Sequence, residues 1–277
     1  MTINPLSTVE PWDLVTDGYT RELIPVFQKW TRDSLEQVPL NRTDSVIDIA
    51  CGPGTVSLLV APIVNQVMAL DFSEEMINAL RKQIDGSGIT NIHAQVCDCQ
   101  ALPFEDEQFD AAFSQFGLMF FPDRMKGFAE AYRVLKPGGR ISVSSWAPVA
   151  QSEAMTTMLE ALEAGFKQYL PSAKDNRNIV KGLDDPDTFI DELQQSGFEN
   201  VAIREVAHSF AADTPARFWK RMAASSAPIT LMRSRISETE WREGEDRAIK
   251  CVADKLAGKE KLYSTAYLAC ASKPKNG

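Results

Sequence analysis

Residues 46–54 combine an apolar strand with a loop of small residues, a pattern typical of a ligand-binding site. Ala50, Gly52 and Gly54 occupy alternate positions of the loop, and Asp48 lies near the end of the strand. A ligand can lie across the carboxyl edge of a parallel sheet only where the backbone carries almost no side chains. The sequence therefore predicts a ligand at this loop, with Asp48 anchoring the loop or binding a cationic group of the ligand.

Asp71, at the end of the next apolar strand, adds a second carboxylate that could reach the same ligand. Glycine-rich turns without a ligand are common, and the dinucleotide fingerprint G-x-G-x-x-G also expects an acidic residue about 20 positions on. Aligning Ala50 and Gly52 with its first two glycines puts Thr55 at the third, where close packing of helix on strand disfavours a side chain. A nicotinamide or flavin dehydrogenase is therefore the weaker interpretation.

The charge balance argues against a nucleic-acid partner. The 277-residue chain has 38 acidic and 29 basic side chains and a net charge of −9, whereas binding to a phosphate backbone depends on clustered Lys and Arg. With 44% hydrophobic residues, the chain can form a domain with a sizeable core. No C-x-x-C pair occurs, so neither a metal site nor a disulfide framework is predicted from the five cysteines.

The N-terminal residues lack the positive charge and apolar run of a signal peptide, and the longest apolar stretch, 111–121, is interrupted by polar residues. We therefore expect no membrane span and a cytoplasmic protein.

Strands and helices alternate between residues 45 and 146, which predicts a parallel sheet covered by helices. The expected strands are 45–50, 67–71, 92–96, 109–115 and 140–146. The expected helices are 55–62, 73–84 and 123–135. Ser73 would cap the second helix, and Lys136-Pro137-Gly138-Gly139 would end the third. The loop at 46–54 and Asp71 would then share one edge of the sheet.

The remaining segments are expected to be mainly helical and to cover the site. Residues 12–38 have the spacing of one or two amphipathic helices with a bend at Pro25. Beyond the fifth strand, the expected elements are a helix at 152–169, a polar loop at 171–182, a helix at 187–196, strands at 201–206 and 261–272, and a mostly helical insertion at 214–256.

We interpret residues 1–277 as one domain. Its core would comprise 40–147, 186–210 and 261–272, and its helical lid segments 1–39, 148–185 and 211–260.

Four motifs, in this order, resemble those of the class I S-adenosylmethionine-dependent methyltransferases, especially the ubiquinone and menaquinone C-methyltransferase branch. They are residues 46–55, residues 69–76 (ALDFSEEM), residues 98–104 (DCQALPF) and residues 134–140 (VLKPGGR). The resemblance covers roughly residues 40–147. It implies a Rossmann-like, mostly parallel α/β sheet of seven strands in the order 3-2-1-4-5-7-6, with the final strand antiparallel. It also implies S-adenosyl-L-methionine as cofactor and S-adenosyl-L-homocysteine as product.

The resemblance further implies roles for single residues near the methionine part and the ribose. Asp48 to Gly54, including Cys51, would surround the methionine moiety, and Asp71 would accept hydrogen bonds from both ribose hydroxyls. Gln115 would offer its carbonyl to the ligand's ammonium group. Ala50 departs from the family pattern, which more often has Gly there.

At the adenine, the implied neighbours are Phe72 and Met76 on its faces, with Asp98 and the backbone N–H of Cys99 at its edge. An alternative for Asp98 is that it only caps the following turn.

Methyl transfer from a sulfonium is an in-line displacement that mainly requires the nucleophile to be held at attack distance, so no acid–base pair is obligatory. His208, expected just after the sixth strand, and Tyr19, in the N-terminal helical segment, are the candidate catalytic residues. His93 is expected to be structural.

Apolar residues near the carboxyl edge and in the insertion suggest the acceptor pocket, although packing alone would also explain them. The expected pocket residues are Phe116, Met119, Phe120 and Trp219. We therefore expect a small hydrophobic or aromatic metabolite as methyl acceptor. The alternatives are a small amine acceptor, a protein that binds the cofactor without transfer, and a dehydrogenase or aminopropyl transferase.

Overall fold

A computed structural model describes residues 4–170 and 182–275. Its centre is a seven-stranded sheet in the order β3-β2-β1-β4-β5-β7-β6. The strands are β1 (Ser45–Ile49), β2 (Gln66–Asp71), β3 (Ile92–Val96), β4 (Phe109–Gln115), β5 (Leu135–Trp146), β6 (Glu199–Ala211) and β7 (Lys261–Ser272). Strands β1 to β5 are parallel, and β7 is antiparallel to both β5 and β6. The predicted fold and strand order are confirmed.

Helices cover both faces of this sheet because successive side chains of a buried strand point to opposite faces. Val46 of β1 packs into a core with residues of α3 (Ser57–Val60) and α4 (Glu74–Ser87). The next residue, Ile47, packs into a second core with α5 (Arg124–Val134) and α7 (Pro186–Gln195). The apolar runs of the strands are therefore buried on both sides.

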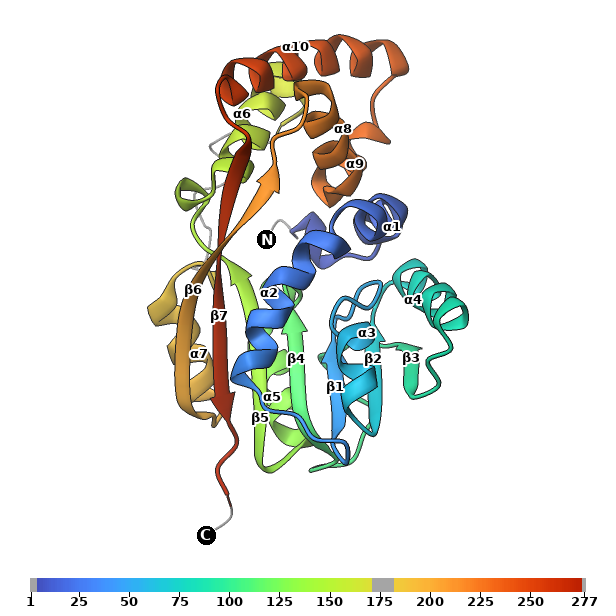
Figure 1. Ribbon diagram of the computed structural model, residues 1–277, viewed down its shortest axis with the longest axis vertical. Coiled ribbons are helices and arrows are strands. Elements are labelled where there is room, and N and C mark those ends of the chain that lie inside the picture. The colour runs from blue at the N-terminus through green and yellow to red at the C-terminus, as the bar shows by residue number, and fades with distance from the viewer. Residues whose placement is uncertain (1–3, 171–181, 276–277) are drawn as a thin grey trace.

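A third apolar core lies beyond the carboxyl edge of the sheet, where β6 and β7 extend past the other strands (Figure 1). It is formed largely by α6 (Glu153–Phe166), α8 (Pro215–Ser225), α9 (Ala227–Arg233) and α10 (Glu238–Leu256), which we call the cap. Phe166 stacks on Trp241 with 4.8 Å between ring centroids. Over residues 4–170 and 182–275, no helix is long and apolar enough to cross a membrane.

The N-terminal segment forms two helices, α1 (Glu10–Glu22) and α2 (Ile24–Gln37), with Pro25 in the first turn of α2, as the predicted bend requires. Helix α1 packs between α4 on one side and the cap helices α8 and α9 on the other (Figure 1). The contact with α8 is close because α1 carries Gly18. A Cβ atom at Gly18 would lie 1.7 Å from the carbonyl oxygen of Ala224.

Several element boundaries differ from the expectation. The helix expected at 55–62 is an α-helix only over Ser57–Val60 and continues as a 3-10 helix at Ala61–Ile63. Strand β6 covers 199–211 rather than 201–206, because it pairs with β7 as far as Ala211 opposite Lys261. Strand β5 begins at Leu135, so the expected turn at 136–139 is part of the strand, with a shift of register beside β4. The loop expected at 171–182 lies outside the described residues, apart from Gly182.

We expect Gly18→Ala to lower the free energy of unfolding by about 1–3 kcal/mol, because backbone rather than a flexible side chain must move to admit the methyl group. Gly86→Ala is the matched control, since a Cβ on this α4 glycine meets nothing within 4 Å; it should be neutral or stabilise by up to about 1 kcal/mol. Urea unfolding of both variants measures the difference. Equal stability of the two variants would contradict the close packing of α1 on the cap.

Candidate functional site

A cavity lies at the carboxyl edge of β1, β2 and β4, and we call it the sheet-edge cavity. It brings together most residues that the sequence assigns to the cofactor. Those that line it are Ala50, Gly52, Asp71, Phe72, Met76, Asp98, Cys99 and Gln115.

Asp71 is buried at this edge and holds two loops together. Its Oδ2 accepts a hydrogen bond from the Gly52 N–H at 2.8 Å, and its Oδ1 accepts one from the Ser73 N–H at 2.9 Å. Burial, reinforced by the negative charge of Asp13, raises the pKa of Asp71 to about 6 even though these backbone donors favour the ionised form. The carboxylate therefore fixes the β1 loop against the start of α4 and still lines the cavity.

Asp48 anchors the β1 loop to Ser57, the first residue of α3. Its Oδ2 accepts hydrogen bonds from the N–H of Ser57 at 3.0 Å and from its hydroxyl at 2.6 Å. Burial raises the pKa of Asp48 to about 7, although Ser57 opposes the shift. Asp48 and Cys51 line a smaller inner cavity. Of the two roles considered for Asp48, the structure makes the loop anchor directly visible.

The loop needs unusual backbone conformations at its small residues. Ala50, Gly52 and Gly54 have φ values of 54°, 53° and 93°, in the left-handed region that favours glycine. The methyl group of Ala50 is accommodated because residue 117 is Gly, whose Cβ would lie 2.5 Å from it. Gly54 lines no cavity, but a Cβ there would lie 2.4 Å from Leu80 Cδ1, so it allows α4 to approach.

Asp98 lies in the sheet-edge cavity and also stabilises its own turn. Its Oδ1 accepts from the Gln100 N–H at 2.9 Å and from Gln100 Nε2 at 3.1 Å. Both interpretations of Asp98 are thus compatible with its position, since each carboxylate oxygen can accept more than one hydrogen bond.

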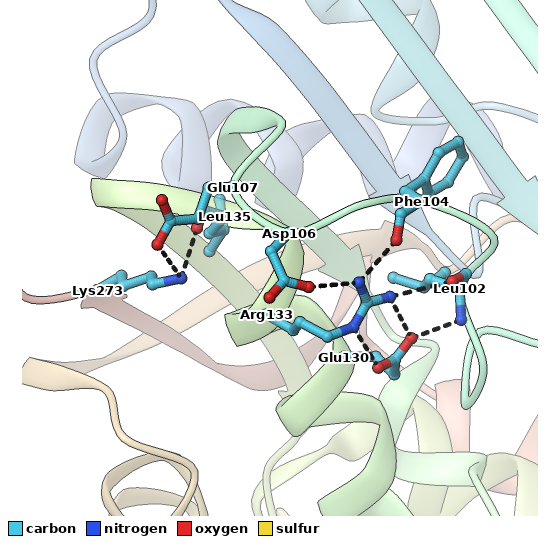
Figure 2. A network of polar contacts seen from close by, with 8 residues as sticks. All are labelled: Leu102, Phe104, Asp106, Glu107, Glu130, Arg133, Leu135 and Lys273. Carbon is cyan, nitrogen blue, oxygen red and sulfur yellow. Dashed lines mark hydrogen bonds and ion pairs between the residues drawn. The ribbon is translucent and has the colours of Figure 1, made fainter.

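A polar network fixes the segment that follows Asp98 (Figure 2). Arg133 donates to the carbonyl oxygens of Leu102 at 3.0 Å and Phe104 at 2.6 Å, and it pairs with Asp106 and Glu130. Glu130 in turn accepts from the Leu102 N–H at 2.6 Å. Because Glu130 and Arg133 both come from α5, the segment that follows Asp98 is tied to this helix.

Gln115, at the end of β4, has a polar group available for a ligand. Its Oε1 accepts from the Ser34 hydroxyl at 3.3 Å, whereas its Nε2 is buried with no partner among the described residues. A buried amide nitrogen without a partner costs free energy. A ligand in the neighbouring cavities would relieve this cost, and rotation of the amide would turn its carbonyl towards a cationic ligand group while its NH₂ donated to Ser34.

A second, larger cavity lies between the sheet edge and the cap, and we call it the apolar cavity. Phe27, Trp146, Met155, Met158 and Phe210 contribute to its walls, along with the expected pocket residue Met119. The wall that it shares with the sheet-edge cavity consists of Leu6, Trp12, Tyr19, Phe116 and Phe120.

Phe116 is one of the residues of this shared wall. Its φ of 58° is rare for a residue with a large side chain, and its N–H donates to Ser144 Oγ at 2.9 Å. The ring stacks on Trp146 with centroids 4.3 Å apart and contacts Phe27 at 4.8 Å. A strained backbone held by close packing is typical of a residue at a functional site.

Tyr19 also borders both cavities as well as the inner one. Burial and the charge of Asp71 raise the pKa of its phenol well above the ordinary value. Tyr19 therefore keeps its proton near neutral pH and can donate a hydrogen bond, but it is a poor general base.

Two expected site residues lie elsewhere. His208 is inside β6 rather than after it; its Nε2 is 2.5 Å from Asp33 Oδ2, its ring meets Trp30 edge-on, and it lines neither cavity. Trp219 is fully buried in the cap, 5.9 Å from Phe166 between ring centroids, and it also lines neither cavity. Hydrophobicity alone did not distinguish a cap core residue from a cavity wall.

The structure also adds residues that the sequence did not single out. Leu6, Ser7 and Trp12 line the sheet-edge cavity, and the Ser7 hydroxyl donates to the Phe120 carbonyl oxygen at 2.8 Å. The only signal in the sequence was the aromatic side chain of Trp12 in a segment expected to cover the site.

As the pH rises from about 4 to about 7, we expect the free energy of unfolding of the parent to decrease relative to that of Asp48→Asn. A carboxyl whose pKa rises on folding stabilises the fold below its unfolded pKa and loses this contribution as the pH rises through its folded pKa. Asn mimics the protonated group at every pH. The difference between the two free energies of unfolding, measured with urea, should change by at most about 1.4 kcal/mol per pH unit.

The exposed α4 residue Asp85 provides the control, since Asp85→Asn should follow the parent. Parallel stability curves for the parent and Asp48→Asn would contradict the raised pKa.

Comparison with known proteins is consistent with this geometry. Residues 46–139 match the family described as "Methyltransferase domain". The chain is 38% identical over 193 residues to the ubiquinone/menaquinone biosynthesis C-methyltransferase UbiE of Citrifermentans bemidjiense. The aligned region covers 63% of this chain and 78% of that protein.

Two solved structures share the fold at low sequence identity. The YcgJ protein from Bacillus subtilis has a TM-score of 0.58 and 17% identity, over 89% of this chain and 98% of that one. The phosphoethanolamine N-methyltransferase 2 of Haemonchus contortus, in complex with S-adenosyl-L-methionine, has a TM-score of 0.55 and 19% identity, over 89% of this chain and 53% of that one.

Four sequence motifs, the strand order and the similarity to a curated enzyme over most of its length therefore agree. The chain belongs to the class I S-adenosylmethionine-dependent methyltransferases and resembles their ubiquinone and menaquinone C-methyltransferase branch.

Proposed function

We propose that this enzyme transfers the methyl group of S-adenosylmethionine to a small, largely hydrophobic or aromatic metabolite bound in the apolar cavity. One observation carries the proposal: the two cavities share a wall that contains Tyr19, Phe116 and Phe120. Reactants bound in adjoining cavities would face each other beside these residues, and holding them in line supplies much of the rate enhancement.

The sheet-edge cavity fits the cofactor. Gly52 borders open space, because a Cβ atom at this residue would meet nothing within 4 Å. A ligand can use this space. We place the ribose at Asp71, whose two oxygens have lone pairs beyond those used by Gly52 and Ser73. The unpartnered amide of Gln115 would then serve the methionine end, and Phe72, Met76, Asp98 and Cys99 the adenine.

The bound cofactor would supply a methyl group on a cationic sulfonium. The acceptor nucleophile would attack the methyl carbon in line with the breaking carbon–sulfur bond, the neutral thioether of S-adenosylhomocysteine would leave, and the acceptor's proton would be lost to solvent. Tyr19 and Phe116 would orient that nucleophile and keep water away from the shared wall. Because Tyr19 retains its proton, it would donate a hydrogen bond to the acceptor rather than remove a proton from it. His208, paired with Asp33 outside both cavities, has no part in this mechanism.

The walls of the apolar cavity favour an aromatic or otherwise hydrophobic acceptor. Aromatic rings and methionine side chains adapt well to flat or extended apolar ligands. A hydroxylated ring of the quinol type would combine an apolar body with a nucleophilic carbon or oxygen. Relatives named for ubiquinone and menaquinone biosynthesis lend weight to this class.

We further propose that the whole chain acts as one catalytic unit, with the cap closing over the acceptor. The acidic net charge of −9 favours a small-molecule partner over a nucleic acid. Of the alternatives, a small amine acceptor would leave most of the apolar cavity unfilled.

We expect Asp71→Ala to weaken S-adenosylhomocysteine binding by tenfold or more, because charge-assisted hydrogen bonds contribute roughly 1.5–3 kcal/mol each. Titration calorimetry at pH 8 measures the dissociation constant, and circular dichroism checks the fold. Asp85→Ala, an exposed change on α4, should bind as the parent does. Unchanged affinity in folded Asp71→Ala would show that the ribose lies elsewhere.

We expect Met155→Trp to raise the KM for the acceptor at least tenfold and to leave cofactor affinity unchanged, because Met155 lines the apolar cavity but not the sheet-edge cavity. The matched control is Leu159→Trp, an exposed position on the same helix. Radiolabelled methyl transfer to a panel of quinols, phenols and small amines identifies the acceptor first. Activity confined to hydrophilic amines such as glycine would exclude a hydrophobic acceptor.

A further inference from the structure

Helix α1 connects the two halves of the site. It packs against α4, whose first turn borders the sheet-edge cavity, and against α8 and α9 of the cap (Figure 1). Its residues Trp12 and Tyr19 line both cavities. A movement of α1 would therefore change both cavities at once.

A chain of hydrogen bonds joins α1 to the carboxylate at the sheet edge. Asp13 Oδ1 accepts from the Ser73 hydroxyl at 2.5 Å, and the Ser73 N–H donates to Asp71 Oδ1 at 2.9 Å. The same hydroxyl oxygen caps α4 by accepting from the Met76 N–H at 3.1 Å. Ser73 is buried, so its contacts with Asp71 and Met76 are shielded from water, and its contact with Asp13 is partly buried.

We infer that Asp13 is a positioning residue for cofactor binding, which acts through Ser73 to orient Asp71 and to hold α1 closed over the bound nucleoside. This inference rests on the proposed placement of the ribose at Asp71. No motif of the sequence pointed to Asp13, because its partner lies 60 positions along the chain.

The charges around Asp71 give the inference a second consequence. The ionisable groups around this carboxylate are themselves acidic and come from α1, β1 and the loops. Asp13 raises the pKa of Asp71, whereas Asp71 in turn raises the pKa values of four others: Asp48, Tyr19, Cys51 and Cys99. Among them, Asp13 adds to the effect of burial in raising the pKa of Asp71.

If the ionised Asp71 binds the ribose, cofactor affinity falls as the pH drops through about 6. Removing the charge of Asp13 removes a repulsion of the ionised Asp71. The fall in affinity at acidic pH, which we call the acidic limb, should therefore move to lower pH. A residue that only packs or only accepts a hydrogen bond would not move it.

The experiment measures S-adenosylhomocysteine affinity from pH 5 to 8 in the full chain and in two variants. Asp13→Asn keeps an acceptor oxygen for Ser73 but loses the charge, whereas Asp13→Ala loses both. Asp17→Asn, on the exposed side of the same helix, is the control.

We expect Asp13→Asn to bind within about twofold of the parent at pH 8 with its acidic limb shifted to lower pH. Asp13→Ala should bind about fivefold or more weakly at pH 8. In the chain without cofactor, Asp13→Ala should also exchange the amide hydrogens of α1 faster, which reports the loosened helix independently of binding.

An affinity limb at the same pH in Asp13→Asn and the parent, or parent-like binding by Asp13→Ala, would overturn the inference. So would a parent affinity that is constant from pH 5 to 8. Parent-like binding by Asp71→Ala would instead overturn the proposed placement of the cofactor, so the two failures can be told apart.

Discussion

The pair of backbone hydrogen bonds accepted by the Asp71 carboxylate is the constraint on which the site depends. They join the β1 loop, through Gly52, to the start of α4, through Ser73. The Cys51 N–H adds a hydrogen bond of 2.8 Å to the Leu70 carbonyl oxygen, and together these contacts hold a loop in which Ala50, Gly52 and Gly54 are left-handed. Burying a carboxylate is costly, and these charge-assisted contacts offset part of that cost.

The sheet and its ligand edge could be predicted because their signals are local. Val46 and Ile47 are both apolar because β1 is buried on two faces. The small residues after β1 allow left-handed backbone conformations and leave room for a ligand close to the loop backbone. The same reasoning located Asp71, the last residue of β2, whereas Asp98, two residues beyond the end of β3, was assigned through the family resemblance. What a strand presents at its carboxyl end depends on its own sequence and on the strand order.

The second wall of the site could not be predicted in this way, because it depends on contacts between distant segments. Trp12 reaches Phe120 with 5.0 Å between ring centroids across more than a hundred residues. His208 lies inside a strand because β7 pairs with that stretch. Trp219 and Phe210 are similarly apolar in the sequence, yet only Phe210 lines the apolar cavity, because the packing of the cap decides which ring faces inward.

The buried carboxylates also explain why hydrogen-bond donors matter at this site. Burial raises the pKa values of both Asp48 and Asp71, which means that their ionised forms are destabilised in the folded chain. Ser57 donates to Asp48, and Gly52 and Ser73 donate to Asp71, so these contacts offset part of that cost. Ribose hydroxyls at Asp71, as proposed, would donate to the same carboxylate, and part of the free energy that folding gives up there would then be recovered on binding.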